Sequence, residues 1–364
     1  MADETSDDDL AVIQDEARRA LAGVASPEGL RDLLIRTGEY DTAFWRTAAE
    51  LGWLGMSLSE TDGGLGMGLA ERCAIAEEIG RALGSAPFAV STCAMSALSR
   101  FGPQPLKDAL LPDAIAGTTI LTVAAFEAGD AGLPLRAATR FEGGRLTGTK
   151  VGVSAGAFAR HALVHAASPD GRSVVTAVDL VQPGVTRRVF ANSIDNSRGY
   201  ADLVFENVPA VLLDGDVIAD ILDELAVVTA FEQVGGASAC LYAARDYALQ
   251  RRVFGQPIGA FQAIKHGLAD IYVAIQVATG AARAAVRASA AELPAAAAAA
   301  RVAAIRAYDI ASTEGMQVFG GIGVTWEAPQ HLYYRRGRCL AMEWGGEPYW
   351  RDRLLNLSIE GLAA

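Results

Sequence analysis

Residues 247–262 of this chain, YALQRRVFGQPIGAFQ, mark the junction between two helices. Arg251 closes one stretch of helically spaced apolar residues, a short turn with Gly255 follows, and Gln262 opens the next helical stretch. An arginine near a helix C-terminus is favourable by itself, and a glycine after it can be an ordinary cap. This fragment alone leaves a structural and a ligand-binding interpretation equally open.

Helical spacing of apolar residues extends from this junction in both directions. A long helix is predicted near residues 219–250 and another near 259–288, followed by the alanine-rich segment AELPAAAAAARVAAIRAYDI. Pro294 falls in the first turn of that third helix, where its missing N–H costs little. The segment continues into periodic apolar positions, so we expect tight helix packing. Residues 214–364 are therefore predicted to form a helical domain.

The pattern of apolar residues differs between the two segments that precede this domain. Residues 1–118 carry apolar positions at helical spacing, which predicts an N-terminal helical domain. Residues 119–213 contain short β-branched and aromatic runs broken by glycine, such as TTILTVAAF and YADLVFENV, which predict a small antiparallel sheet. The order is α, then β, then α without βαβ repeats. This predicts an α+β fold and argues against a doubly wound nucleotide fold.

Composition limits the classes of function. The net charge of −12 gives no support for a nucleic-acid surface. The four cysteines lie far apart without a CxxC pair, and neither they nor the four histidines show metal spacing, so we expect buried thiols and no metal site. The start of the chain is acidic where a signal peptide is basic, and we find no charge-free apolar stretch of about eighteen residues. We expect a cytoplasmic protein without membrane insertion.

A second motif, QVFGG, spans Gln317 to Gly321, where paired glycines let a backbone approach a ligand closely. Together, in this order and spacing, the two motifs resemble the acyl-CoA dehydrogenase family, and so do FWRTAAELGWLGMSLSETDGGLGMG, GRLTGTKVGVS and DLVFENVP. The resemblance covers essentially the whole chain. It implies two helical domains around a β-domain, with each FAD lying across a dimer interface.

The resemblance also implies a role for each motif residue. In the family, these elements reach across the interface to the ADP half of the neighbour's flavin. Arg251 is then expected to meet the pyrophosphate as a charge-assisted fork. The remaining residues expected to flank or line the nucleotide are Phe254, Gln262, Gln317, Gly320 and Gly321, and Ser154 matches the family's KxW(I/V)(T/S) element beside the ring.

The glutamate that removes the acyl α-proton in the family is missing. It normally stands twenty-three residues beyond the second glycine of QxxGG, which here is Trp344, a residue that cannot accept a proton. Glu343 is adjacent, but a one-residue displacement swings a side chain by roughly a hundred degrees, so we expect it to point elsewhere. An alternative family position, twenty-six residues before Arg251, is Leu225, with Glu224 again one residue off.

Other positions near the ring and substrate also depart from the family. The expected arginine after the alternative base is Ala226, the tryptophan beside the flavin is Gly152, and the TEPxAGSD loop is reduced to AFEAGDAG. Asp223 matches a position that usually lies near the substrate. All the departures are on the substrate and ring side, and the ADP side is intact.

For the remaining charged residues, a structural role is weighed against a functional one. Glu232 is a weak candidate for a relocated base, although a polar residue on a helix rim is the commoner case. Glu127 is a remnant of the loop glutamate with either a structural or a functional role. The basic cluster Arg335, Arg336 and Arg338 is interpreted as a solvated or interface face rather than a CoA clamp.

The resulting hypothesis is a non-catalytic subunit that gives its ADP-binding elements to a catalytic homologue. The resemblance to heteromeric α2β2 acyl-CoA dehydrogenases of steroid or cholate side-chain breakdown implies FAD, an acyl-CoA substrate at the partner's site, and electron-transfer flavoprotein or a similar acceptor. One alternative is a self-sufficient homotetramer with Glu343, Glu347 or Glu232 as base. Another is a flavin monooxygenase of the same fold, and a flavin-free scaffold ranks last.

Overall fold

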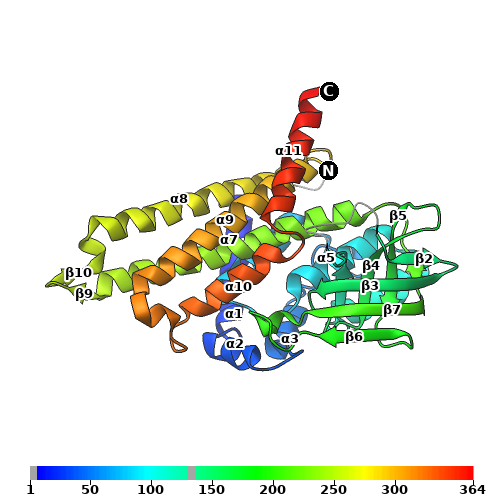
Figure 1. Ribbon diagram of the computed structural model, residues 1–364, viewed down its shortest axis with the longest axis horizontal. Coiled ribbons are helices and arrows are strands. Elements are labelled where there is room, and N and C mark those ends of the chain that lie inside the picture. The colour runs from blue at the N-terminus through cyan, green and yellow to red at the C-terminus, as the bar shows by residue number, and fades with distance from the viewer. Residues whose placement is uncertain (1–5, 130–136, 364) are drawn as a thin grey trace.

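A computed structural model describes residues 6–129 and 137–363 of the chain. Helices form its first part, and Figure 1 shows them beneath and behind the long helices of the last part. Their bounds are α1 Asp7–Ala22, α2 Pro27–Leu34, α3 Thr42–Glu50, η1 Glu60–Asp62, α4 Leu69–Ala82, α5 Phe88–Phe101 and α6 Gln104–Ile115. Three of these helices have an N-cap side chain. Ser6, Ser26 and Asp41 each accept a hydrogen bond from a backbone N–H of the first turn.

A single sheet follows, and it lies at one end of the molecule (Figure 1). Its elements are β1 Leu121–Ala124, β2 Arg140–Glu142, β3 Arg145–Val153, β4 His161–Ala167, β5 Ser173–Asp179, β6 Val185–Val189, η2 Asn196–Arg198, β7 Ala201–Pro209 and β8 Val211–Leu212. The order is β6-β7-β3-β2-β4-β5-β8, with β1 on β4. The predicted antiparallel pairing holds except that β1 and β2 each pair with β4 in parallel. Neither strand is joined to β4 by a hairpin, and the hairpin partner of β2 is β3.

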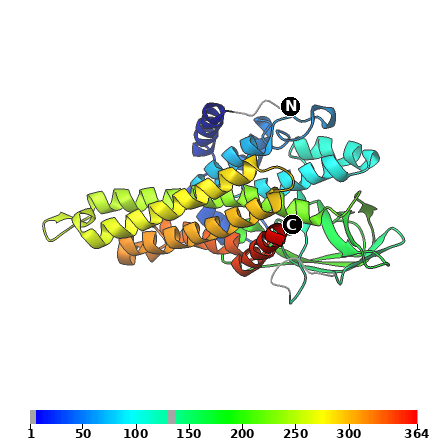
Figure 2. The same cartoon turned by 90° about the horizontal axis from the view of Figure 1, so that it is seen from above.

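Helices return after the sheet, which confirms the predicted α+β fold class. They are α7 Ile218–Gln250, α8 Gln262–Arg287, α9 Leu293–Phe319, η4 Gly320–Val324, α10 Gln330–Met342 and α11 Glu347–Ala363, with the short strands β9 Arg252–Val253 and β10 Gln256–Pro257 and the turn η3 Ile258–Ala260 between α7 and α8. The helices α7, α8 and α9 run side by side in both views, and α11 projects from the body (Figures 1 and 2).

The alanines of α9 allow this close packing. Ala297, Ala300, Ala304 and Ala307 are fully buried against the neighbouring helices, and Pro294 lies in the first turn as predicted. All four cysteines are free and buried, which confirms the prediction for the thiols. Helix α7 is long and apolar enough to cross a membrane, but 89% of its most apolar window is buried inside the protein. It is the central core helix.

Two glycines set the crossing of α4 and α7. A Cβ on Gly80 would lie 1.8 Å from the carbonyl oxygen of Glu232, and a Cβ on Gly235 would lie 1.8 Å from the carbonyl oxygen of Glu77. The two backbones are therefore in direct contact, which requires glycine on both helices. This contact fixes where along α7 the side chain of Glu232 emerges.

We expect Gly235→Ala to destabilise the protein, because the added methyl group must push α4 and α7 apart. Overpacking of this kind typically costs about 1–3 kcal/mol. The control is Gly280→Ala on α8, where an added Cβ meets nothing within 4 Å. That change should stabilise the helix by roughly 0.5–1 kcal/mol. Denaturant unfolding of both variants measures the difference, and equal free energies of unfolding would contradict the close crossing.

Candidate functional site

A cavity of about 530 Å³ lies between the sheet and the turn that joins α10 to α11. Its walls come from residues far apart in the sequence: the end of β1, the end of β3, the segment after β6 and the α10–α11 turn. The residues that matter most below are Phe126, Gly152, Ser154, Tyr200, Glu343 and Trp344. Gly152, Ser154 and Trp344 were expected on the ring side, and the structure brings these three together with Glu343, which was expected to point elsewhere.

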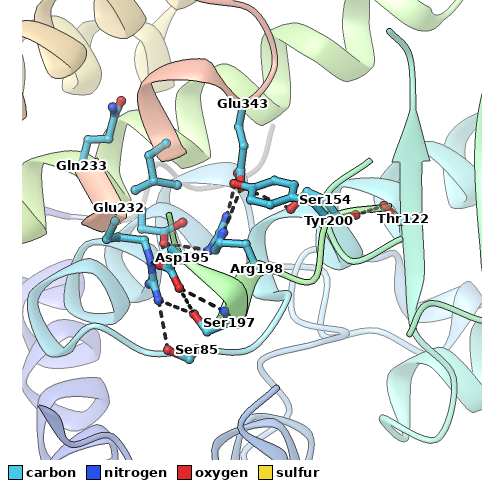
Figure 3. A network of polar contacts seen from close by, with 12 residues as sticks. Ser85, Thr122, Ser154, Asp195, Ser197, Arg198, Tyr200, Glu232, Gln233 and Glu343 are labelled. Atoms are coloured by element: carbon cyan, nitrogen blue, oxygen red, sulfur yellow. Dashed lines mark hydrogen bonds and ion pairs between the residues drawn. The ribbon is translucent and has the colours of Figure 1, made fainter. Parts of the chain in front are cut away.

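Glu343 is the carboxylate in the cavity wall, and it is engaged on all sides. Arg198 donates to it twice, from Nε at 2.9 Å and from Nη2 at 2.7 Å, Tyr200 donates at 2.5 Å, and Ser154 donates at 3.3 Å (Figure 3). Burial alone would raise the pKa of Glu343, but the charge and hydrogen bonds of Arg198 and the Tyr200 hydroxyl hold that pKa below its usual range.

The expectation that Glu343 points away from the cavity was wrong. The expected rotation of roughly a hundred degrees applies between consecutive residues of a helix. Helix α10 ends at Met342, Glu343 has ψ 139°, and Trp344 and Gly345 have φ values of 61° and 98°. The chain is therefore in an open turn, and both Glu343 and Trp344 line the cavity and are buried.

The ion pairs continue inward from Arg198 to a second arginine. Arg198 also donates to Glu232 at 3.1 Å, and the Arg336 guanidinium lies 3.5 Å from the same carboxylate. Arg336 in turn donates to Asp195 at 2.6 Å and to the hydroxyls of Ser85 and Ser197; these three partners are labelled in Figure 3. Two expectations are corrected here, because Glu232 is not on a helix rim and Arg336 is not on a solvated face.

A third buried arginine fixes the end of α10. Arg301 on α9 donates to the carbonyl oxygens of Leu340 and Glu343, the latter at 2.6 Å, and to the side chain of Gln233. These carbonyls have no helical partner at the C-terminus of α10, so Arg301 satisfies them. In the basic cluster of Arg335, Arg336 and Arg338, the two remaining arginines also have partners. Arg335 donates to the carbonyl oxygen of Ile194, and Arg338 forms an ion pair with Asp309.

The alternative base position is in the core. Leu225 and Ala226 are fully buried, and neighbouring Glu224 accepts from Arg72 and Arg100, each at 2.5 Å. Asp223, expected near a substrate, instead accepts from Arg353 on α11 at 2.7 Å. Burial raises the pKa of Asp223 to about 6 despite this partner. Each carboxylate near this position is therefore tied to an arginine.

Glu127 has a structural role. Its carboxylate accepts from Lys150 at 2.7 Å and from the backbone N–H groups of Ala138 and Thr139. Burial opposes ionisation, but these donors lower the pKa of Glu127 to about 2. The carboxylate thus fastens the two ends of the segment that begins with AFEAGDAG, of which residues 130–136 lie outside the described residues.

The ADP-side motif residues lie at the opposite end of the helical bundle from the sheet, at the β9–β10 turn and at η4 (Figure 1). Arg251, Gln262 and Gln317 are exposed, and within residues 6–129 and 137–363 their side chains make no hydrogen bond or ion pair. Tyr247 stacks on Phe319 with ring centroids 4.3 Å apart, which joins the two motifs. The structure brings these residues to one surface, where their polar groups have no partner among the described residues.

The backbone of these motifs is open to an approaching ligand. Phe254 has a φ of 52° and is 91% exposed, which is unfavourable for a large apolar side chain that has no partner. Gly320 has φ 62° and ψ −143°, a conformation nearly restricted to glycine. A Cβ on Gly320 or Gly321 would meet nothing within 4 Å in this chain. Packing inside the chain does not explain the second glycine.

Thiol and metal chemistry find no support in the part of the chain that the structure describes. No three His, Cys, Asp or Glu residues there could hold a metal ion. Burial raises the pKa of Cys93 to about 12 and that of Cys339 to about 11, so both thiols stay protonated at neutral pH.

Sequence reasoning missed Arg198, Tyr200 and Asp195. They lie in the segment between β6 and β7, more than a hundred residues from Glu343, and no local spacing connects them to it. The one available signal was NSRGY, an arginine and a tyrosine next to a glycine directly before a predicted strand. That signal does not identify the partner.

Comparison with known proteins gives matches over nearly the whole chain. A model of the acyl-CoA dehydrogenase N-terminal domain matches residues 7–118, and one of the acyl-CoA dehydrogenase C-terminal domain matches residues 215–351. The acyl-CoA dehydrogenase IpdE2 of Mycobacterium tuberculosis is 32% identical over 91% of this chain and 92% of its own length.

Two solved structures superpose along the chain. A variant of the Tcur3481–Tcur3483 steroid ACAD matches with a TM-score of 0.90 and 31% identity, covering 98% of this chain and 99% of its own. The ChsE4–ChsE5 complex from Mycobacterium tuberculosis matches with a TM-score of 0.90 and 26% identity over the same shares.

We expect Glu343→Ala to destabilise the protein strongly, because it leaves the buried Arg198 with only Glu232, a carboxylate that it shares with Arg336. Breaking a buried pair typically costs about 3–5 kcal/mol. The control is Glu347→Ala, which removes a half-exposed pair with Arg306 and should cost about 0–1 kcal/mol. Denaturant unfolding compares the two. Equally small losses would mean that Arg198 does not depend on Glu343.

Proposed function

Since this chain belongs to the acyl-CoA dehydrogenase family, whose members are oxidoreductases, we propose that it is the non-catalytic subunit of a heteromeric, FAD-dependent acyl-CoA dehydrogenase. The observation that carries the proposal is the state of the base segment. Trp344 stands at the base position, and the neighbouring carboxylate of Glu343 is locked in a buried ion network.

Glu343 is poorly suited to remove an α-proton. A general base works best with a pKa near the working pH and with a lone pair free to meet the proton. The pKa of Glu343 is lowered, and Arg198, Tyr200 and Ser154 already donate to its oxygens. A self-sufficient dehydrogenase remains the second candidate only because Glu343 lines the cavity. It would have to break these bonds first.

The motif residues at the β9–β10 turn and at η4 suit a bound nucleotide better than the cavity beside the sheet suits a flavin ring. When bound, FAD would supply the hydride acceptor of the reaction. Arg251 would bind the pyrophosphate, Phe254 and Gln262 would flank the nucleotide, and Gln317, Gly320 and Gly321 would line it. Their free donors and open backbone support this assignment. Ser154, by contrast, is already bonded to Glu343 on the ring side.

A second chain is needed to complete the flavin site. The ADP-side motifs and the cavity lie at different ends of this chain, so one copy cannot present both to the same FAD (Figure 1). Exposed apolar residues on α8, namely Tyr272, Val273 and Val277, favour burial in an assembly. We propose an α2β2 heterotetramer in which a catalytic homologue supplies the glutamate and the ring pocket.

The relatives suggest the substrate class. They are named a steroid ACAD and a complex of two different chains, which supports steroid or cholate side-chain acyl-CoA esters and a heteromeric assembly. Electron-transfer flavoprotein or a similar acceptor would reoxidise the flavin. The proposal includes the division into residues 1–118, 119–213 and 214–364 and a cytoplasmic location.

We expect Arg251→Ala to strip FAD from the assembled complex, although this chain supplies no catalytic group. One charge-assisted phosphate contact is typically worth roughly 1.5–3 kcal/mol, so the flavin dissociation constant should rise by about tenfold to a hundredfold. The control is Arg245→Ala, an exposed arginine earlier on α7 that is paired with Asp246. Flavin fluorescence after dilution measures release. Unchanged retention in the Arg251 variant would refute the pyrophosphate role.

A further inference from the structure

We propose that the cavity between the sheet and the α10–α11 turn is a non-catalytic binding site for a neutral, flat, apolar ring system that carries a carbonyl group. The inference rests on the proposed function in one respect, namely that no flavin ring occupies this cavity. It adds a second kind of ligand to the complex, bound by this chain and distinct from the substrate that reacts at the partner's site.

The size and lining of the cavity suit such a ligand. Its volume of about 530 Å³ falls within the range of roughly 300–1,000 Å³ that is typical of small-molecule pockets. Apolar side chains such as Val123, Phe126 and Val151 make up most of the wall. Gly152 has no side chain, and an added Cβ there would meet nothing within 4 Å, so the cavity has open space along this wall. A rigid ring system can lie against such a wall with little loss of entropy.

The mouth of the cavity carries large apolar side chains in contact with solvent. Phe190, Ile194 and Met342 line it and are 40%, 48% and 75% exposed. Such side chains gathered at the rim of a pocket mark a surface that an apolar ligand covers. Arg338 also lines the cavity, but its charge is paired with Asp309.

Electrostatics at the inner wall select a neutral ligand with an acceptor. Arg198 neutralises the Glu343 carboxylate and Tyr200 also donates to it, so this wall offers little to an anion or to a cation. Gly345 lines the same wall, and its backbone N–H finds no acceptor within the described residues. A ligand carbonyl satisfies a donor of this kind, whose desolvation is otherwise costly.

The test uses the co-purified complex of this chain with its catalytic homologue. Androst-4-ene-3,17-dione, a neutral ring ketone without CoA, is the probe, and equilibrium dialysis counts bound ketone per heterodimer. Met342→Glu and Phe190→Glu each place a charge at the mouth. The control is Ile35→Glu, at a residue of equal exposure to Met342 (75%) that does not line the cavity. Gel filtration and the flavin count verify that each variant assembles.

We expect ketone binding at this cavity to weaken at least tenfold in both mouth variants and to stay unchanged in Ile35→Glu, with acyl-CoA oxidation unaffected. Ketone binding that is absent, or equal in all variants, would overturn the inference. The number of FAD molecules per heterodimer tests the proposed function separately. One FAD per heterodimer supports that function whether or not the ketone binds. Two FAD per heterodimer with no ketone bound would overturn both the proposed function and this inference.

Discussion

The buried ion pair between Arg198 and Glu343 is the contact on which the site depends. Taking two charges out of water is expensive, and the pair is tolerated only because further donors and acceptors surround it. Three arginines and three carboxylates balance each other in one network: Arg198, Arg301 and Arg336 with Asp195, Glu232 and Glu343. The network joins α7, the segment before β7, α9 and α10, and so fixes the wall of the cavity.

Under the proposed function, this arrangement explains how the chain can keep the fold of an acyl-CoA dehydrogenase without a base. In place of a carboxylate free to take a proton, the α10–α11 turn presents a buried indole and a carboxylate neutralised by Arg198. The positive φ of Trp344 is unfavourable for a bulky residue, and Arg301 stabilises the turn by binding the carbonyl of Glu343. The cavity is mainly apolar, which under the proposed function suits it to binding rather than to proton transfer.

The sequence predicted the features that depend on local pattern. Apolar spacing located α7, α8 and α9, and the two glycine-containing motifs located an exposed surface with free donors. The direction of Glu343 could not be predicted, because the rotation rule assumes a helix and the chain leaves the helix one residue earlier. The burial of Glu232 and Arg336 was also missed, since their partners Arg198 and Asp195 come from the β-domain segment and meet them only in the folded chain.

The central claim is that this chain carries half of a flavin site and no base. Its most direct test is the FAD-to-protein ratio and the rate of acyl-CoA oxidation, measured for the chain purified alone and after co-expression with a catalytic homologue. The chain alone should hold much less than one FAD and oxidise no acyl-CoA, whereas the complex should hold about one FAD per heterodimer and be active. A stoichiometric yellow protein from this chain alone, active on any acyl-CoA, would contradict the claim.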